Sequence, residues 1–320
     1  MSIINYNSYM PPKKPKMRLD TLLLDKQFFP SREQARSAII QGAILVEKEK
    51  VTKPGTFINP ESEITVLFTT NPYVGRGGIK LEGALGFFEI SALDKICLDI
   101  GTSIGGFTDC LLKRGAKKVY AVDVGYGQFD FKLRKDPRVV LFERTNVRYL
   151  MPEKVYKKDE PKATVCAVDL SFISLSKVFK PVVDLVENTV ETHILTLFKP
   201  QFEALKSEVE KKGIITDKTV HEALLLGFVE NISNLGLYVR GLTYSPITGQ
   251  AGNIEFWFDV TFNENDTSHV NEDIVVQVVE EAHKKLGKKW QRKSDYFTMQ
   301  PEEKMPELLT GWKSFYMKKA

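Results

Sequence analysis

The segment KICLDIGTSIGGFTDCLLKRGAKKVYAVDVG, residues 95–125, decides the fold. It opens with the short apolar run Ile96–Ile100, which has the length and composition of a buried parallel strand. A glycine-rich turn follows, then a helical stretch over Phe107–Arg114, and then a second apolar run, Val119–Val122. A strand, a tight turn, a helix and a further strand in this order predict a Rossmann-like α/β domain, with a sheet flanked by helices.

The glycine-rich turn predicts a nucleotide cofactor site. Asp99, Gly101, Gly105 and Gly106 form the pattern D-x-G-x-x-x-G-G, which differs from the dinucleotide pattern G-x-G-x-x-G. A pyrophosphate favours an anion site at a helix N-terminus, whereas an acid at the strand end suits a cofactor with a cationic amino acid. Asp123, at the end of the second strand, is placed to bind both hydroxyls of an adenosine ribose. S-adenosylmethionine is therefore preferred to NAD; a tight turn without a ligand is the purely structural alternative.

Charged residues also stand at the ends of later predicted strands. Asp169 follows the apolar run VCAV, and Lys199 follows the run HILTLF. Such positions line the ligand crevice of open α/β sheets. Glu255 lies near the start of a late alternating strand, which suits an antiparallel neighbour whose start lies at the same edge. Each residue alone could equally be an ordinary strand-end charge, and Lys80, after two glycines, could be a solvated lysine.

A smaller module is expected before this domain. The segment MRLDTLLLDK places leucines on one helical face, and Ser31 with Gln34 has the spacing of a capping box that begins a second helix. Gly42 is placed to end that helix. A short strand and a turn at Lys48-Glu49 follow, so two helices are expected to pack on a small sheet in an α+β arrangement.

Basic side chains on this module predict contact with RNA. The candidates are Arg18, Arg32, Arg36 and Lys53. Arg32 and Arg36 are four residues apart and therefore share one helical face. A basic face on a module too small to be an enzyme is typical of an RNA-binding protein. An isolated arginine pair would more often be a solvated helix face.

Composition narrows the class of protein. The chain has 320 residues and a formal net charge of +4, which suggests about two domains and permits nucleic acid as a partner. The three cysteines lack paired spacing, which predicts reduced thiols in a cytoplasmic protein, without a disulfide framework or a metal site. No apolar run approaches the length that spans a bilayer. Neither a membrane nor an obligate protein partner is therefore expected.

We divide the chain into five parts on this basis. They are a disordered basic arm at 1–16, the small module at 17–72, a glycine-rich linker at 73–82, the Rossmann-like domain at 83–264 and a lysine-rich helical extension at 265–320. Within the extension, a helix expected at 274–293 is interpreted as a solvated helix packed on the body, with an additional RNA contact as the alternative.

Several motifs, in order, resemble known families. RLDTLLLDKQFFPSREQARSAIIQGAILV followed by KPG resembles an S4 RNA-binding domain. Lys80, Asp169, Lys199 and Glu255 together match the K-D-K-E tetrad of ribose 2′-O-methyltransferases. The series G-R-G-G-x-K-L, D-I-G-x-S-x-G-G-F-T, E-R-T-N-V-R, D-L-S-F-I-S-L, K-P-Q-F-E and G-N-I-E-F resembles the TlyA (hemolysin A) family of RNA methyltransferases.

This resemblance implies an S4 domain joined to an FtsJ-like domain that uses S-adenosylmethionine. The implied reaction methylates the ribose 2′-hydroxyl of cytidines in ribosomal RNA, so ribosomal RNA or ribosomal subunits are the expected partners. The four tetrad residues would be catalytic. The residues implied around the cofactor are Asp99, Gly101, Thr102, Ser103, Gly105, Gly106, Asp123 and Asn146.

A ribose hydroxyl must lose its proton as it attacks a methyl group. Lys199 is expected to be the general base, since desolvation beside a second lysine favours its neutral form. Asp169 and Glu255 would orient it, and Lys80 would stabilise the developing alkoxide. The alternatives are a non-catalytic RNA-binding protein, a base methyltransferase, for which no Asn-Pro-Pro-Tyr-like motif or catalytic cysteine is visible, and a membrane-active haemolysin.

Overall fold

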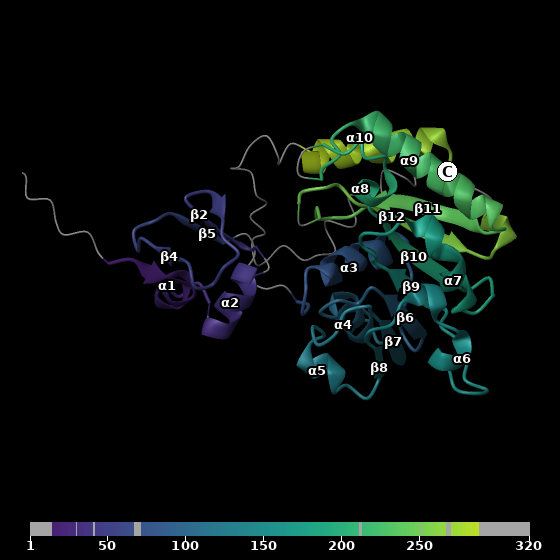
Figure 1. Ribbon diagram of the computed structural model, residues 1–320, viewed down its shortest axis with the longest axis horizontal. Helices are drawn as coiled ribbons and strands as arrows, with labels where there is room; N and C mark the ends of the chain where they lie inside the picture. Colours follow the sequence, from purple (N-terminus) through teal and green to yellow (C-terminus); the bar gives the residue numbers. More distant parts are fainter. Residues whose placement is uncertain are drawn as a thin grey trace, which may run out of the picture. The chain divides into compact units, whose positions relative to one another are not determined.

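The chain divides into two compact units, each of which is described by itself (Figure 1). A computed structural model describes residues 15–29, 31–40, 42–66, 72–210, 213–249, 251–266 and 270–287. The expected arm at 1–16 therefore lies almost wholly outside the described residues, as does the extension beyond residue 287.

The first unit is built from two helices and short strands. Its elements are β1 Met17–Arg18, α1 Leu19–Asp25, α2 Arg32–Ile40, β2 Ile44–Val46, β3 Glu49–Lys50, β4 Phe57–Ile58 and β5 Ile64–Val66. The strands form a sheet in the order β3-β2-β5 and a separate β1-β4 pair. Leu19, Leu22 and Leu23 are buried in the core, as their spacing predicts. The Ser31 hydroxyl accepts the N–H of Gln34 at 3.2 Å, which confirms the predicted helix start.

The hairpin turn of this unit differs from the prediction. Val46 pairs with Glu49, so the two turn residues are Glu47 and Lys48, one position earlier than expected. Both have left-handed backbones, with φ of 50° and 65°. A two-residue turn that follows the twist of its strands needs positive φ at both positions. Sheet pairing therefore imposes this geometry on residues that do not favour it.

The second unit contains a seven-stranded sheet in the order β11-β12-β10-β9-β6-β7-β8. Its strands are β6 Ile96–Ile100, β7 Lys118–Val122, β8 Val139–Phe142, β9 Val165–Val168, β10 His193–Phe198, β11 Tyr238–Tyr244 and β12 Phe256–Thr261. Neighbours from β10 to β8 pair in parallel, whereas β12 is antiparallel to both β10 and β11. The α/β fold class and the reversed late strand are thus confirmed.

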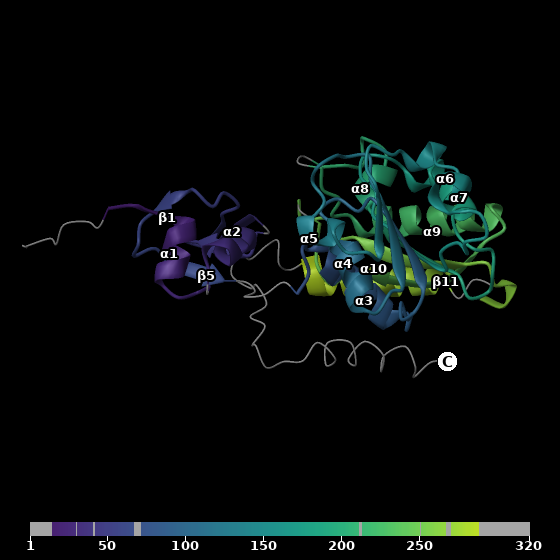
Figure 2. The ribbon, with the colours of Figure 1, turned by 90° about the horizontal axis from the view of Figure 1, so that it is seen from below.

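Helices cover both faces of this sheet (Figure 2). They are α3 Gly77–Phe87, α4 Gly106–Lys113, α5 Phe131–Arg134, α6 Pro152–Val155, α7 Phe179–Asp184, α8 Pro200–Glu203, α9 Lys218–Asn234 and α10 Glu272–Ala282. Side chains alternate between the faces along each strand. Trp257 packs with α3 and α4, while its neighbours Phe256 and Phe258 pack on the face covered by α7 and α9.

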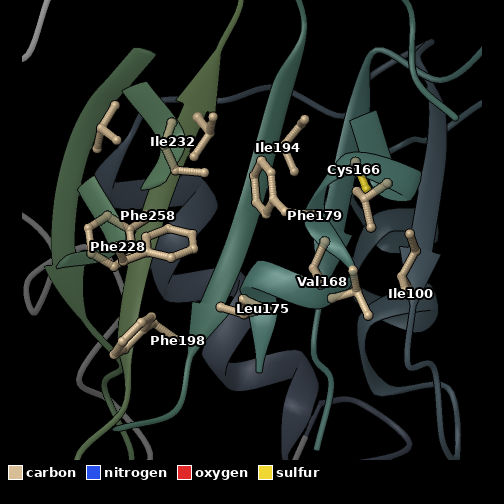
Figure 3. Packing of buried hydrophobic residues seen from close by; sticks show 14 of the residues in the cluster. Ile100, Cys166, Val168, Leu175, Phe179, Ile194, Phe198, Phe228, Ile232 and Phe258 are labelled. Carbon is tan, nitrogen blue, oxygen red and sulfur yellow. The ribbon is translucent and has the colours of Figure 1, made fainter. Parts of the chain in front are cut away.

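Aromatic rings fill the α7–α9 side of the sheet (Figure 3). Phe228 of α9 contacts Phe179 of α7, Phe198 of β10 and Phe258 of β12, with ring centroids 5.8, 5.4 and 4.6 Å apart. Leu175, which follows the loop after β9, belongs to the same buried cluster. This core fixes the strand ends that carry the site.

The expected linker at 73–82 is instead part of the second unit. Tyr73 is buried, and α3 begins at Gly77. The glycines permit close packing: a Cβ on Gly78 would lie 2.2 Å from the Tyr73 ring, and one on Gly106 would lie 3.0 Å from the Gly78 nitrogen. The glycine content that suggested flexibility serves contact between α3 and α4.

The extension begins with a helix that joins the core. Asn271 caps α10 by accepting the N–H of Ile274 at 3.0 Å. Val275, Val278 and Val279 are fully buried in the cluster that includes α9 and β11. The helix is therefore packed on the body, as one of the two interpretations held, but it ends at Ala282 and a π-helical turn, His283–Gly287, follows. No helix in the described ranges is long and apolar enough to cross a membrane.

Candidate active site

The four tetrad residues meet at one edge of the large sheet. Asp169 directly follows β9 and Lys199 directly follows β10, so both stand at the carboxyl ends of parallel strands. Glu255 precedes the antiparallel β12, whose first residue, Phe256, pairs with Phe198 at the end of β10. The reversal of β12 therefore brings Glu255 to the same edge. Lys80 comes from the first turns of α3.

The tetrad is divided into two ion pairs. Lys80 Nζ lies 2.5 Å from Glu255 Oε2, and Lys199 Nζ lies 2.5 Å from Asp169 Oδ1. Only 11% of the Lys80 side chain and 10% of the Lys199 side chain are exposed, so both pairs are largely desolvated. Charge interactions are stronger in such surroundings than in water. The structure thus brings the four residues of the tetrad together.

Lys80 is held as a cation. Burial alone would lower the pKa of Lys80, but the Glu255 carboxylate and the nearby Asp169 carboxylate outweigh burial, so the pKa of Lys80 is raised. A charged ammonium at this position can stabilise negative charge on a neighbouring oxygen.

Lys199 is oriented by two oxygen partners. Besides its ion pair with Asp169, its Nζ donates to the Ser171 hydroxyl at 2.8 Å. The nitrogen has three positions besides its bond to carbon, and these two partners occupy two of them. A neutral amine would keep a hydrogen for Ser171 and would present a lone pair at the position that neither partner occupies. This arrangement suits proton abstraction from a hydroxyl placed there.

The glycine turn between β6 and α4 packs directly beside this edge. Gly101 and Gly105 have φ of 86° and 98°, which favours glycine. A Cβ on Gly101 would lie 2.2 Å from the Asp169 carbonyl oxygen, so the turn and the tetrad approach through their backbones. A Cβ on Gly106 would meet the start of α3, and the expected contact of Gly106 with the cofactor stays a prediction.

Asp99 lies buried beneath this turn. Its Oδ2 accepts the Thr108 hydroxyl at 2.6 Å, and Thr108 in turn contacts the Thr102 hydroxyl at 3.1 Å. Burial raises the pKa of Asp99 to about 7. Asp99 Oδ1 is buried and has no hydrogen-bond partner among the described residues. An unpartnered buried carboxylate oxygen beside a glycine turn fits a cationic ligand group.

Asp123 joins the ends of two strands. Its Oδ2 accepts the Ser103 N–H at 2.7 Å, and its Oδ1 accepts the Gly125 N–H at 2.6 Å. Oδ1 also accepts the Gln128 side-chain amide at 3.2 Å, so about one of the roughly four acceptor positions of the carboxylate remains for a ligand hydroxyl. Asn146, after β8, accepts the Arg148 N–H at 3.1 Å through its amide oxygen. These residues lie around the carboxyl ends of β6, β7 and β8, and their contact with a cofactor stays a prediction.

Some residues of the site were not predicted from the sequence. Ser171 orients Lys199, and Glu203 accepts hydrogen bonds from Ser174 and Leu175. Both lie in motifs that we quoted, D-L-S-F-I-S-L and K-P-Q-F-E, but only the charged strand-end residues were interpreted. The Asn253 side chain, two residues before Glu255, forms hydrogen bonds with the backbone of residues 213 and 215. These bonds hold the segment that leads into β12.

Exposed aromatic residues surround this edge. Phe172 is 90% exposed, and its ring lies 5.1 Å from that of Phe202. The Arg144 guanidinium lies 4.0 Å from the Tyr126 ring centroid, in the segments that follow β8 and β7. Exposed aromatics interleaved with cations are typical of surfaces that stack nucleic-acid bases.

In the first unit, the predicted RNA-binding residues are organised by a buried acid that we did not anticipate. Asp20 accepts Arg18 Nη2 at 2.9 Å and Arg32 Nη2 at 3.1 Å. The hydrogen bonds from Arg18 hold the pKa of Asp20 down, at about 2. Arg18 also lies over the Lys53 loop, since a Cβ on Gly55 would be 3.1 Å from its Nη1. Arg36 is exposed one turn beyond Arg32.

Comparison with known proteins agrees with both units. A family model described as FtsJ-like methyltransferase matches residues 73–262, and one described as S4 domain matches residues 17–64. The first match begins at Tyr73, in agreement with the assignment of α3 to the second unit.

Hemolysin A of Brachyspira hyodysenteriae is 43% identical over 240 residues, which covers 75% of this chain and 98% of that protein. The 16S/23S rRNA (cytidine-2′-O)-methyltransferase TlyA of Mycobacterium tuberculosis is 37% identical over 243 residues, which covers 76% and 88%. A solved structure from Streptococcus thermophilus, named as a hemolysin, is 36% identical with a TM-score of 0.68 and covers 87% of this chain and 99% of its own. From its two domain matches and these relatives, the chain belongs to the TlyA (hemolysin A) family of S4-containing, FtsJ-like methyltransferases.

Proposed function

We propose that this protein uses S-adenosylmethionine to methylate the ribose 2′-hydroxyl of cytidine in ribosomal RNA. The observation that carries the proposal is the division of four buried charges into two ion pairs, Lys80–Glu255 and Lys199–Asp169, directly beside the glycine turn. The relative from Mycobacterium tuberculosis is named for this reaction. RNA is the substrate that the S4 unit, with Arg32 and Arg36 on one helix, and the exposed aromatics favour.

The turn and strand ends fit the proposed cofactor. Asp99 Oδ1 would face its ammonium group, and the remaining acceptor position of Asp123 would take a ribose hydroxyl. Thr102, Ser103 and Asn146 would complete the surroundings. When bound, S-adenosylmethionine supplies an electrophilic methyl group on sulfur.

The residues of this chain would prepare the ribose hydroxyl. Lys199, held by Asp169 and Ser171, would take the hydroxyl proton at Nζ. Lys80, kept charged by Glu255, would stabilise the developing alkoxide. Phe172 would stack on a nucleotide base turned out of its RNA stack. Arg18, Arg32, Arg36 and Lys53 would bind RNA phosphates away from the reaction.

The test is methyl transfer from labelled S-adenosylmethionine to ribosomal RNA, free and within each subunit, followed by nuclease digestion and mass analysis. We expect a methylated cytidine ribose with the natural protein and with Lys206→Ala, an exposed lysine after α8. Lys199→Ala should bind the cofactor normally but lose about 10²- to 10⁴-fold in rate. RNA binding without transfer by the natural protein would favour the non-catalytic alternative, and full activity of Lys199→Ala would refute its assignment as base.

A further inference from the structure

The loop between β9 and the 3₁₀ turn Leu175–Lys177 carries three groups of the site on a strained backbone. Asp169 and Ser171 contact Lys199, and Phe172 projects into solvent. The φ of Phe172 is 64°, a left-handed conformation that a bulky aromatic residue rarely adopts. Such strain persists only where surrounding contacts hold it, and it concentrates at functional sites.

The contacts that hold this loop come from the two ends of α8. At the start of α8, Lys199 donates to Ser171 at 2.8 Å. At its end, Glu203 receives the Ser174 hydroxyl at 2.6 Å and the Leu175 N–H at 2.8 Å, one on each carboxylate oxygen. Phe172, the strained residue, lies between these two attachments.

Glu203 makes these contacts at a cost. None of the ion pairs found in the described ranges includes Glu203, and burial raises the pKa of its carboxyl group. A partly buried carboxylate without a cation is unfavourable unless hydrogen bonds compensate it. Both hydrogen bonds that the Glu203 carboxylate accepts come from the loop, from Ser174 and Leu175. Leu175 itself is buried in the core cluster with Val168 and Phe198 (Figure 3). The two hydrogen bonds that Glu203 accepts from Ser174 and Leu175, called the Glu203 clamp below, therefore join α8 to a residue that the core holds in place.

We propose that Glu203 is a positioning residue for methyl transfer, which holds the 171–175 loop in the strained conformation that places Ser171 on Lys199. This inference rests on the proposed function. It predicts that loss of the clamp lowers the rate of the chemical step, because Lys199 loses one of its two orienting partners. Cofactor binding, which uses the β6 and β7 ends, should be unaffected.

The variants are Glu203→Ala, Glu203→Gln and Ser174→Ala, with Glu208→Ala as the matched control. Glu208 lies in the next loop, and among the described residues its carboxylate accepts the N–H of Leu205. Glutamine keeps a carbonyl oxygen that can accept the Leu175 N–H. Its NH2 group can donate to the Ser174 hydroxyl oxygen in place of accepting the Ser174 hydroxyl hydrogen. We would measure single-turnover transfer at saturating RNA and cofactor, the Kd of S-adenosylmethionine by calorimetry, and hydrogen exchange of the amides of residues 171–175.

For Glu203→Ala we expect a rate reduced about 10- to 100-fold, with cofactor Kd unchanged and faster exchange in the loop. Ser174→Ala should show a smaller loss in the same direction, and Glu203→Gln should retain most activity. A rate for Glu203→Ala equal to that of Glu208→Ala, or an equal loss in cofactor affinity, would overturn the inference. If the natural protein transfers no methyl group, the proposed function fails; loop exchange in Glu203→Ala then still decides whether the clamp exists.

Discussion

At the level of single residues, the pairing within the tetrad gives its two lysines different surroundings. Lys80 forms its ion pair with a buried carboxylate, which raises the pKa of Lys80 and keeps it a cation. Lys199 contacts a less buried carboxylate and a neutral hydroxyl, which leaves a position for a substrate oxygen. Sequence motifs point to the four residues, and these contacts are the basis for the different roles that we propose for the two lysines.

From the raised pKa of Asp99 we predict that binding of S-adenosylmethionine releases a proton. The pKa of Asp99 is raised to about 7, so below that pH the free protein holds the carboxyl group largely protonated. A bound ammonium group favours the ionised carboxylate. Affinity for S-adenosylmethionine should therefore rise between about pH 6 and pH 8, with a proton released on binding near pH 6.5. Calorimetry in two buffers of different ionisation enthalpy measures this release, which Asp99→Asn should abolish.

Phe172 predicts an unusual order of stability between two small replacements. Both Phe172→Ala and Phe172→Gly remove an exposed ring, but only glycine relieves the left-handed backbone at φ 64°. Phe172→Gly should therefore be more stable than Phe172→Ala by about 1 kcal/mol, as measured by denaturant unfolding. Equal stability, or a more stable alanine variant, would show that the loop conformation carries no strain.

At the level of elements, strands with a regular apolar pattern could be predicted from the sequence. Features that depend on contacts between distant residues could not. β6 was predicted at its observed bounds because it is an uninterrupted apolar run, and the reversed β12 followed from Glu255 at its start. The helical state of α3 was missed because paired glycines disfavour helices, and here packing on Gly106 outweighs that preference. Asp20 and Glu203 were missed because an acid in sequence indicates exposure until its partners are known.

The contact between α9 and α10 predicts sensitivity to acid. His221 of α9 is fully buried, and its Nδ1 lies 2.9 Å from Nε2 of His283 after α10. Burial lowers the pKa of His221 to about 3, and burial also lowers the pKa of His283. The folded state thus prefers neutral rings, so the stability they contribute is present above about pH 6.5 and is lost as pH falls toward 3.

Between pH 7 and pH 5 the His221 contribution should fall by about 2 kcal/mol. Urea unfolding followed by circular dichroism at the two pH values measures the loss. In His221→Phe, which keeps a ring beside Phe256, the difference should shrink. An unchanged pH dependence in this variant would place the acid sensitivity elsewhere in the molecule.

At the level of the whole molecule, the proposed function uses both units of the chain. The predicted phosphate contacts lie in the first unit, and the tetrad lies in the second. Arg36→Ala should therefore raise the KM for RNA and reduce the salt slope of RNA binding by about one, with kcat and cofactor affinity unchanged. Lys26→Ala, an exposed lysine in the same unit, is the control. A fall in kcat at saturating RNA would show that the units act together in the chemical step.

The position of β12 in the sheet also has a consequence for synthesis on the ribosome. β12 lies between β10 and β11, so the edge of β10 has no partner on that side until residue 261 has been made. Translation of the stretch between β10 and Glu255 takes several seconds at about 5–20 residues per second. A nascent chain is therefore expected to expose that edge for this time and to lack a complete tetrad. Activity should begin only when the final strands have been released and have closed the sheet.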